Sequence, residues 1–124
     1  MSRISRTEAV RSVIDDYVDG VRRGDAALLA DIFHPGAQMY GYLDGAPTNV
    51  PISAFFAMLR QFAAPADSGE QYRAVVTAIT VGATAAVAEL HEEDYLGRDF
   101  TDYFALLEVD GRWLIVNKTY EQVR

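Results

Sequence analysis

The sequence predicts an α+β fold in which helices pack on one face of a curved, mostly antiparallel sheet. Three observations support this class. Apolar residues recur at helical spacing in the first part of the chain and alternate with polar residues in the second part. Two apolar runs also flank Asp110-Gly111, which is a hairpin signal. Helices that come first and antiparallel strands that follow indicate helices gathered on one face of a sheet.

The first predicted helix is the longest. Ser5-x-x-Glu8 is a capping box that places the helix start near Arg6, and Gly24 is the expected C-cap. One face is apolar and consists of Val10, Val13, Ile14, Tyr17, Val18 and Val21. Gly20 costs about 1 kcal/mol relative to alanine inside a helix. It indicates either the close approach of another element or a tolerated glycine near the helix end.

Two shorter helices and a strand are expected next. Asp25 is a natural N-cap for a helix that ends at His34-Pro35, because proline disfavours helix in the residue before it. Residues 37–43 are predicted as a strand and 44–47 as a turn. A third helix is predicted for 52–62. Its apolar side consists of Phe55, Phe56, Leu59 and Phe62.

The second half is predicted as strands after a loop at 65–69. The strands span 71–81, 84–95, 100–109 and 113–120. In the third of them, Asp102 alternates onto one face with Phe100, Phe104 and Leu106. A carboxylate on an apolar face needs a partner, a proton or a function, so we expect a pocket there.

The opposite face of that strand carries Tyr103, Ala105 and Leu107. A sheet that is apolar on both faces needs cover, most simply from a second copy of itself. We therefore expect a homodimer formed through the sheet.

Composition limits the class of protein. The 124 residues suit a single domain spanning 1–124, and the net charge of −7 argues against nucleic acid or an anionic membrane as partner. There is no apolar run near the roughly 20 residues of a membrane span. The start lacks a signal-peptide core, so a cytoplasmic location is expected. Phosphate loops, nucleophile triads and metal-spaced histidines are missing, so no cofactor or metal is predicted.

Several motifs resemble the nuclear-transport-factor-2-like, or SnoaL-like, superfamily over essentially the whole chain. They are Gly24-Asp25, Leu29-x-x-Ile32-Phe33-His34-Pro35-x-Ala37, and Phe100-Thr101-Asp102-Tyr103 leading to Asp110-Gly111-x-Trp113-x-Ile115-Val116-Asn117-Lys118. The last two pieces look most like the branch labelled putative lumazine-binding. The resemblance implies a cone-shaped fold, in which a bent sheet wraps a long helix and leaves a pocket. Its members include enzymes and non-catalytic binders, so the fold leaves function open.

A more distant similarity to steroid isomerases of this superfamily suggests roles for three positions. Those enzymes use a helix-one tyrosine and a protonated aspartic acid as an oxyanion hole, and a second aspartate as base. Tyr17 and Asp102 match the first two, whereas the base position falls on Gly41, which has no side chain to take a proton. We therefore expect Gly41 to face the cavity and Asp102 to be the sole carboxylate at its centre.

Other candidate site residues follow from their positions. His34, near the start of the first strand, is a candidate base. The candidates for lining the pocket are Met39, Gly41, Phe55, Phe56, Leu59, Phe104, Val116 and Lys118. Residues 91–94 read His-Glu-Glu-Asp, but adjacent strand residues point to opposite faces, so we expect a solvated acidic strand end and no metal site.

The place of Lys118 depends on the register of the hairpin. A two-residue turn at Asp110-Gly111 pairs Asp102 with Thr119 and puts Lys118 on the outer face. A bulged turn pairs Asp102 with Lys118, and we favour it because it brings Val116 onto the cavity face. Beside Lys118, Asp102 is expected to be ionised and a poor donor. Beside Thr119 in an apolar pocket, it can stay protonated and donate.

Three functions remain open at this point. The first is a dimeric pocket protein that binds a compact, largely apolar small molecule with Tyr17 and Asp102 as polar anchors. The second is an isomerase, cyclase or dehydratase that uses general acid–base chemistry, with His34 or a pocket water as base. The third is a non-catalytic dimerisation or interaction module.

Overall fold

The computed structural model describes residues 1–124 and confirms the α+β class. The helices are α1 (Arg3–Arg23), α2 (Ala26–Ile32), α3 (Ile52–Leu59) and α4 (Pro65–Ser68). The strands are β1 (Phe33–Leu43), β2 (Ala46–Pro51), β3 (Arg73–Val81), β4 (Ala85–Tyr95), β5 (Arg98–Val109) and β6 (Arg112–Gln122). They form one sheet in the order β2-β1-β6-β5-β4-β3, in which β1 and β6 are the parallel pair and all other neighbours are antiparallel.

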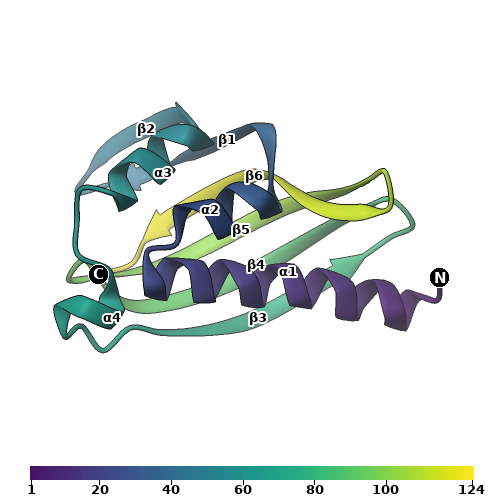
Figure 1. The fold of residues 1–124 in the computed structure, drawn as a ribbon, viewed down its shortest axis with the longest axis horizontal. Coiled ribbons are helices and arrows are strands. Elements are labelled where there is room, and N and C mark those ends of the chain that lie inside the picture. The colour runs from purple at the N-terminus through teal and green to yellow at the C-terminus, as the bar shows by residue number, and fades with distance from the viewer.

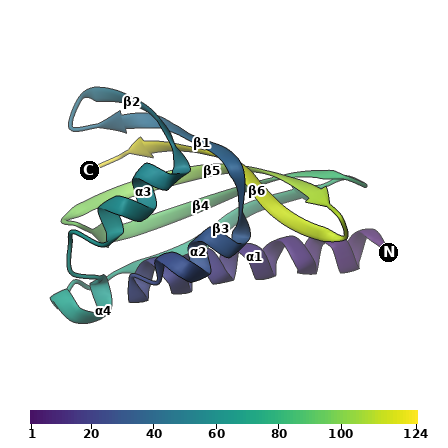
Figure 2. The ribbon, with the colours of Figure 1, turned by 45° about the horizontal axis from the view of Figure 1, so that its top comes forward.

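The helices cover one side of a bent sheet. Figure 1 shows α1 running along the β3–β4 part of the sheet, with α3 beside β1 and β2 at the other end. Figure 2 shows β1 and β2 turning away from the plane of β3, β4 and β5, with the helices on a single side. The bend and the long α1 produce the arrangement that the family resemblance implied.

The junction between α1 and α2 agrees closely with the predicted caps. Gly24 has a left-handed φ of 65° and closes α1, while Asp25 accepts a hydrogen bond from the Leu28 backbone N–H at 3.0 Å and opens α2. The start of α1 differs from the prediction. The N-cap is Ser2, whose side chain accepts from the backbone N–H of Ser5, so the helix begins at Arg3 rather than near Arg6.

The region between α2 and β3 holds more structure than the sequence indicated. Strand β1 begins at Phe33, and β2 was missed because its prolines disfavour a strand. Strand β2 is at the edge of the sheet, so no strand pairs with its outer side. A proline, which lacks the backbone N–H, therefore costs no ladder hydrogen bond on that side. Helix α3 ends at Leu59, and the predicted helical residue Phe62 lies beyond it and is exposed.

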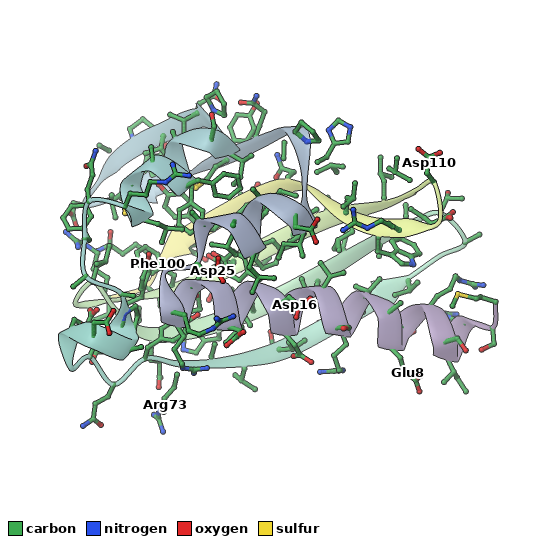
Figure 3. The ribbon with its side chains drawn as sticks, viewed as in Figure 1. Glu8, Asp16, Asp25, Arg73, Phe100 and Asp110 are labelled. Carbon is green, nitrogen blue, oxygen red and sulfur yellow. The ribbon has the colours of Figure 1, made fainter.

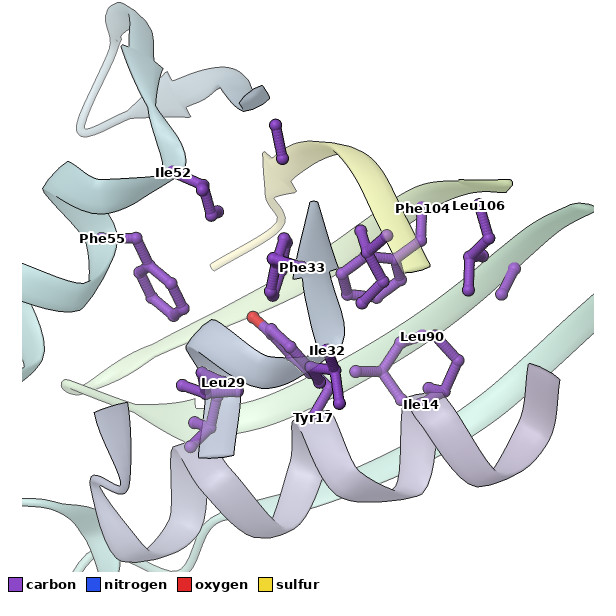
Figure 4. Close-up of a cluster of buried hydrophobic side chains, with 14 of the residues drawn as sticks. Ile14, Tyr17, Leu29, Ile32, Phe33, Ile52, Phe55, Leu90, Phe104 and Leu106 are labelled. Atoms are coloured by element: carbon purple, nitrogen blue, oxygen red, sulfur yellow. The ribbon is translucent and has the colours of Figure 1, made fainter. Parts of the chain in front are cut away.

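The core fills the space between α1 and the sheet. Figure 4 shows Ile14 and Tyr17 rising from α1 toward Leu90 and Phe104 on the strands, with Phe55 approaching from α3. The predicted inward face of β5 is confirmed, because Phe100, Asp102, Phe104 and Leu106 are all buried. Charged residues lie outside. Figure 3 shows Glu8 on α1 and Arg73 on the edge strand β3 projecting away from the core.

The hairpin between β5 and β6 follows neither predicted register. Its turn has two residues, Asp110 and Gly111, both at positive φ, and pairs Val109 with Arg112. A bulge further along then inserts Val116 as an extra residue in β6, so that Asp102 faces Tyr120 rather than Thr119 or Lys118. The favoured bulged turn is therefore wrong, because the bulge lies within the strand.

The bulge nevertheless puts Lys118 on the inner face. Lys118 pairs with Phe104, whose side chain lies in the core, and it is only 5% exposed. Without the extra residue, every side chain of β6 beyond that point would change face. The bulge thus determines that Lys118 sees the cavity and that its neighbours Asn117 and Thr119 face outward.

Gly20 makes the close approach that was one of the two interpretations of its position. A Cβ atom added there would lie 2.8 Å from both Cγ and Cδ2 of Leu29, a fully buried residue of α2. We expect Gly20→Ala to lower the free energy of unfolding by about 1 kcal/mol, because overpacking costs about 1–3 kcal/mol and the gain in helix propensity is about 1 kcal/mol. Urea denaturation measures this, with the exposed α1 position Ser12→Ala as control. A more stable Gly20→Ala protein would show that the contact is loose.

Candidate functional site

An apolar cavity of about 190 Å³ lies between α3, the β1–β2 arm and the inner faces of β5 and β6. Its apolar wall includes Met39, Leu43, Val50, Phe55, Met58 and Phe100. Its polar and charged wall consists of Thr48, Glu92, Tyr95, Arg98, Asp102, Lys118 and Tyr120. Ionisable side chains are thus gathered into one part of an otherwise apolar space, which is the usual character of a small-molecule site.

Two carboxyl groups meet in the wall of this cavity. Glu92 on β4 and Asp102 on β5 are diagonal neighbours on the same face, because Leu90 pairs with Asp102 and Glu92 pairs with Phe100. They are 2% and 1% exposed and are hydrogen-bonded to each other. A hydrogen bond between two carboxyl groups requires a proton on one of them.

The proton belongs on Glu92. Burial raises the pKa of Glu92 well above its usual range, and the charge of Asp102 and the hydrogen bond to it raise the pKa further. The charge of Lys118 and the hydrogen bond from Tyr72 act in the opposite direction and are smaller. We call Glu92 and Asp102 the carboxyl pair. It carries one proton and one negative charge.

Two tyrosine hydroxyls donate hydrogen bonds to the carboxyl pair. The Tyr17 hydroxyl donates to Oδ2 of Asp102 at 3.3 Å, and the Tyr72 hydroxyl donates to Oε2 of Glu92 at 2.5 Å. Burial raises the pKa of both tyrosines well above the usual value, so both stay protonated and act as donors. Figure 4 shows Tyr17 extending from α1 with its hydroxyl end toward Phe33 and Phe55.

Lys118 brings a positive charge to the same wall. Its Nζ lies 3.8 Å from the ring centroid of Phe55, 5.3 Å from that of Tyr17 and 5.7 Å from that of Tyr120. These distances are typical of cation–π contacts, which partly replace the lost hydration of the ammonium. No carboxylate lies within ion-pair distance of Nζ, so the expected direct contact between Lys118 and Asp102 does not form.

The structure brings five of the predicted site residues together. Tyr17 and Asp102 are hydrogen-bonded, and Met39, Phe55 and Lys118 line the cavity beside them. The other predicted lining residues do not reach the cavity wall. Leu59 and Phe104 are core residues, and Phe56 and Val116 are half-buried elsewhere.

Gly41 and His34 do not occupy the places expected of them. A Cβ atom at Gly41 would lie 2.5 Å from the backbone oxygen of Tyr120, so this position packs against β6 and has no room for a side chain. His34 is exposed at the start of β1, where its Nδ1 accepts from the backbone N–H of Gly36 at 2.9 Å. It cannot serve as a base in the cavity.

Glu92 is the candidate site residue that sequence reasoning missed. The prediction that Asp102 is the only central carboxylate is wrong, and so is the prediction that 91–94 is wholly a solvated end. The neighbouring Glu93 does face outward, where it pairs with Arg73 at 2.7 Å. The alternation of residues along β4 could have identified it, because Glu92 continues the inward-facing series Ala86, Ala88 and Leu90.

Comparison with known proteins gives the class and then the family. The chain resembles solved nuclear-transport-factor-2-like proteins of unknown function. One from Shewanella baltica OS155 has a TM-score of 0.89 and 27% identity, covering 100% of this chain and 98% of that one. One from Silicibacter pomeroyi DSS-3 has a TM-score of 0.88 and 25% identity, covering 98% and 99%. The profile of the family described as putative lumazine-binding matches residues 5–121, and the chain belongs to that family.

A curated relative carries the name of an activity. It is aldolase FrzH from Cladobotryum sp., which is 29% identical over 117 residues, covering 94% of this chain and 90% of that protein. In addition, none of the helices here is both long enough and apolar enough to cross a membrane.

The raised pKa of Glu92 makes stability depend on pH. A carboxyl group whose pKa is higher in the folded state contributes stability below its unfolded pKa of about 4.3 and loses that contribution as pH rises through its folded pKa. We therefore expect the unfolding free energy of the wild type, minus that of Glu92→Gln, to fall as pH rises above about 4.3. Chemical denaturation over a pH series measures the difference.

Glu93→Gln is the matched control for this series. It removes the adjacent carboxyl group on the outer face and leaves the carboxyl pair intact. Its difference from the wild type should lack the downward trend. A flat Glu92→Gln difference would mean that Glu92 titrates in the folded protein as it does in the unfolded chain.

Proposed function

We propose that this protein is an enzyme that binds a compact, mostly apolar carbonyl compound and moves a proton at the carbon next to the carbonyl. The observation that carries the proposal is the carboxyl pair, which places one acid and one base in the wall of an apolar cavity. Two carboxyl groups with different proton affinities can exchange acid and base roles without help from solvent. The apolar surroundings strengthen the electrostatic interaction of the carboxyl groups with a bound ligand.

The roles of the four polar groups follow from their contacts. The carboxylate of Asp102 is the base that removes a proton from the ligand. The carboxylic acid of Glu92 supplies the proton that goes back to the ligand by way of Asp102. Tyr17 and Tyr72 are positioning residues, because each uses its hydroxyl hydrogen on the carboxyl pair. This differs from the isomerase-like expectation, in which Tyr17 and Asp102 together donate to the ligand.

The comparisons support carbonyl chemistry of the aldol type. Proton removal next to a carbonyl is the first step of an aldol addition, and the relative from Cladobotryum is named an aldolase. The family description, putative lumazine-binding, also names a small molecule. A cavity of about 190 Å³ suits a ligand somewhat larger than benzene, since benzene fits a cavity of about 150 Å³.

Deuterium exchange tests the proposed function without knowledge of the natural substrate. In heavy water, the wild type should speed the exchange of hydrogen next to the carbonyl of cyclohexanone or phenylacetone, as followed by proton NMR. Asp102→Asn and Glu92→Gln should reduce this rate by about 10²-fold or more, because each removes the acid–base pair. Glu93→Gln should retain the wild-type rate. If the wild type binds the ketones without exchanging them, the cavity is a binding site only.

We also propose that two copies associate through the outer face of the sheet. Val87, Tyr103 and Leu107 are each about half exposed there, and Val87 and Tyr103 border an open groove that also contains Ala105. An apolar patch of this kind on a sheet is most simply covered by the same patch of a second copy, because isologous contacts close into a dimer.

Light scattering after size exclusion tests this association. The wild type should elute as a dimer at micromolar concentration, and Leu107→Glu should give monomers or aggregates, because a charge would be buried in the interface. Ala30→Glu adds the same charge at an exposed position of α2 and should remain dimeric. A monomeric wild type would rule out the dimer.

A further inference from the structure

Most hydrogen-bond donors in the wall of the cavity are already engaged within the chain. The carboxyl pair uses the hydroxyl hydrogens of Tyr17 and Tyr72. Arg98 donates through Nε and Nη2 to Asp44 and through Nη1 to the backbone oxygen of Leu96. The hydroxyls of Thr48 and Tyr120 lie 2.6 Å apart and bond to each other. The hydroxyl hydrogens of these groups are thus engaged, and Arg98 directs three of its five N–H groups to acceptors in the chain.

Two donors in the wall have no partner within the chain. The first is the ammonium of Lys118, which contacts three aromatic rings but no acceptor oxygen. The second is the hydroxyl of Tyr95, on which only burial and the charges of nearby carboxylates act. The two residues are 5% and 7% exposed, and neither polar end is a fully buried atom without a partner, so both remain accessible from the cavity that they line.

Both free donors lie near the carboxyl pair. All four residues line the same cavity, where the charge of Lys118 lowers the pKa of Glu92 and the charges of Glu92 and Asp102 raise the pKa of Tyr95. A ligand that fills the cavity therefore meets one base and two donors. A ligand that fills the cavity covers these two donors, so acceptor oxygens on the ligand are their natural complement.

The charges limit the kind of ligand further. The carboxyl pair contributes one negative charge, Lys118 contributes one positive charge, and the charge of Arg98 is balanced by Asp44, so the site is neutral before a ligand enters. A neutral ligand that gives a proton to the carboxylate moves the negative charge onto its own oxygen, beside Lys118. The total charge then stays at zero, and no net charge is brought into the apolar space.

We infer that the cavity takes enolisable 1,3-dicarbonyl compounds and holds them as enolates, with one oxygen on the Lys118 ammonium and the other on the Tyr95 hydroxyl. The inference rests on the proposed function, because the same carboxyl pair removes the proton. It assigns the oxyanion site to Lys118 and Tyr95 rather than to Tyr17 and Asp102.

The proton transfer is balanced within the site. The C–H bond between the two carbonyl groups breaks, and its proton forms an O–H bond on the carboxyl pair. The electron pair left behind spreads over the two ligand oxygens as the enolate. Neither oxidant nor other reactant is required. Donors placed where this charge develops stabilise it without reorganising at the moment of reaction.

Pentane-2,4-dione and pentan-2-one form a matched pair of probes, since they share a five-carbon chain and differ by one carbonyl. At neutral pH the wild type should bind the dione at least tenfold more tightly, as measured by calorimetry. The bound dione should show the ultraviolet absorption of its enolate, although the free dione is not ionised under these conditions. Equal affinity for the two probes, or a bound dione without the enolate spectrum, would overturn the inference.

Variants of the two donors test their assignment. Lys118→Met should reduce the preference for the dione at least tenfold and remove the enolate spectrum, and Tyr95→Phe should reduce the preference several-fold. Lys118→Arg keeps a cation at the same place and should retain part of the preference, which controls for a packing defect in Lys118→Met. Full preference in Lys118→Met would overturn the assignment. A covalent adduct between the dione and Lys118, detected by mass spectrometry, would replace enolate binding with imine chemistry.

The two proposals fail in different ways. Deuterium exchange into simple ketones without any preference for the dione would leave the proposed function standing and overturn this inference. Enolate binding of the dione without exchange into ketones would overturn the proposed function and leave the assignment of the oxyanion site in place.

Discussion

The hydrogen bond between Glu92 and Asp102 is the interaction on which the rest of the site depends. Two adjacent strands bring the carboxyl groups together on one face, and burial keeps a proton between them. If both groups were ionised, they would repel each other inside an apolar wall, and their charges would lack compensation. One retained proton allows the pair, Lys118 and the surrounding aromatic rings to occupy the same small volume.

The backbone of β6 places the positive charge. The bulge at Val116 changes which side chains of β6 face inward, and Lys118 reaches the cavity only because of it. A bulge of this kind changes the direction of side chains next to a site while the rest of the ladder continues. Regular pairing from the turn to the end of β6 would have left Lys118 on the outer face of the sheet, away from the carboxyl pair.

Local chemistry was readable from the sequence wherever one or two residues determine it. Gly24 and Asp25 mark the junction of two helices, Asp110-Gly111 marks a hairpin, and the alternation around Asp102 fixes its inward face. Features that depend on distant strands were not readable. The bulge at Val116 arises within the β5–β6 ladder, and the open edge that tolerates the prolines of β2 exists only in the assembled sheet. The fold class and family were therefore predictable, and the register was not.

Glu92 shows why a site of this type is only half visible in a sequence. Asp102 stands out because aromatic residues surround it in the chain, whereas Glu92 lies between a histidine and two further acidic residues and resembles a solvent-exposed segment. Its burial arises only in the assembled fold, where Asp102 lies diagonally across from it on β5 and the Tyr72 hydroxyl donates to it. Apolar residues of similar size could replace such a buried ionic group without loss of stability. Under the proposed function, the two carboxyl groups and the lysine serve the adjoining cavity, where their unused acceptor and donor capacity would meet a ligand.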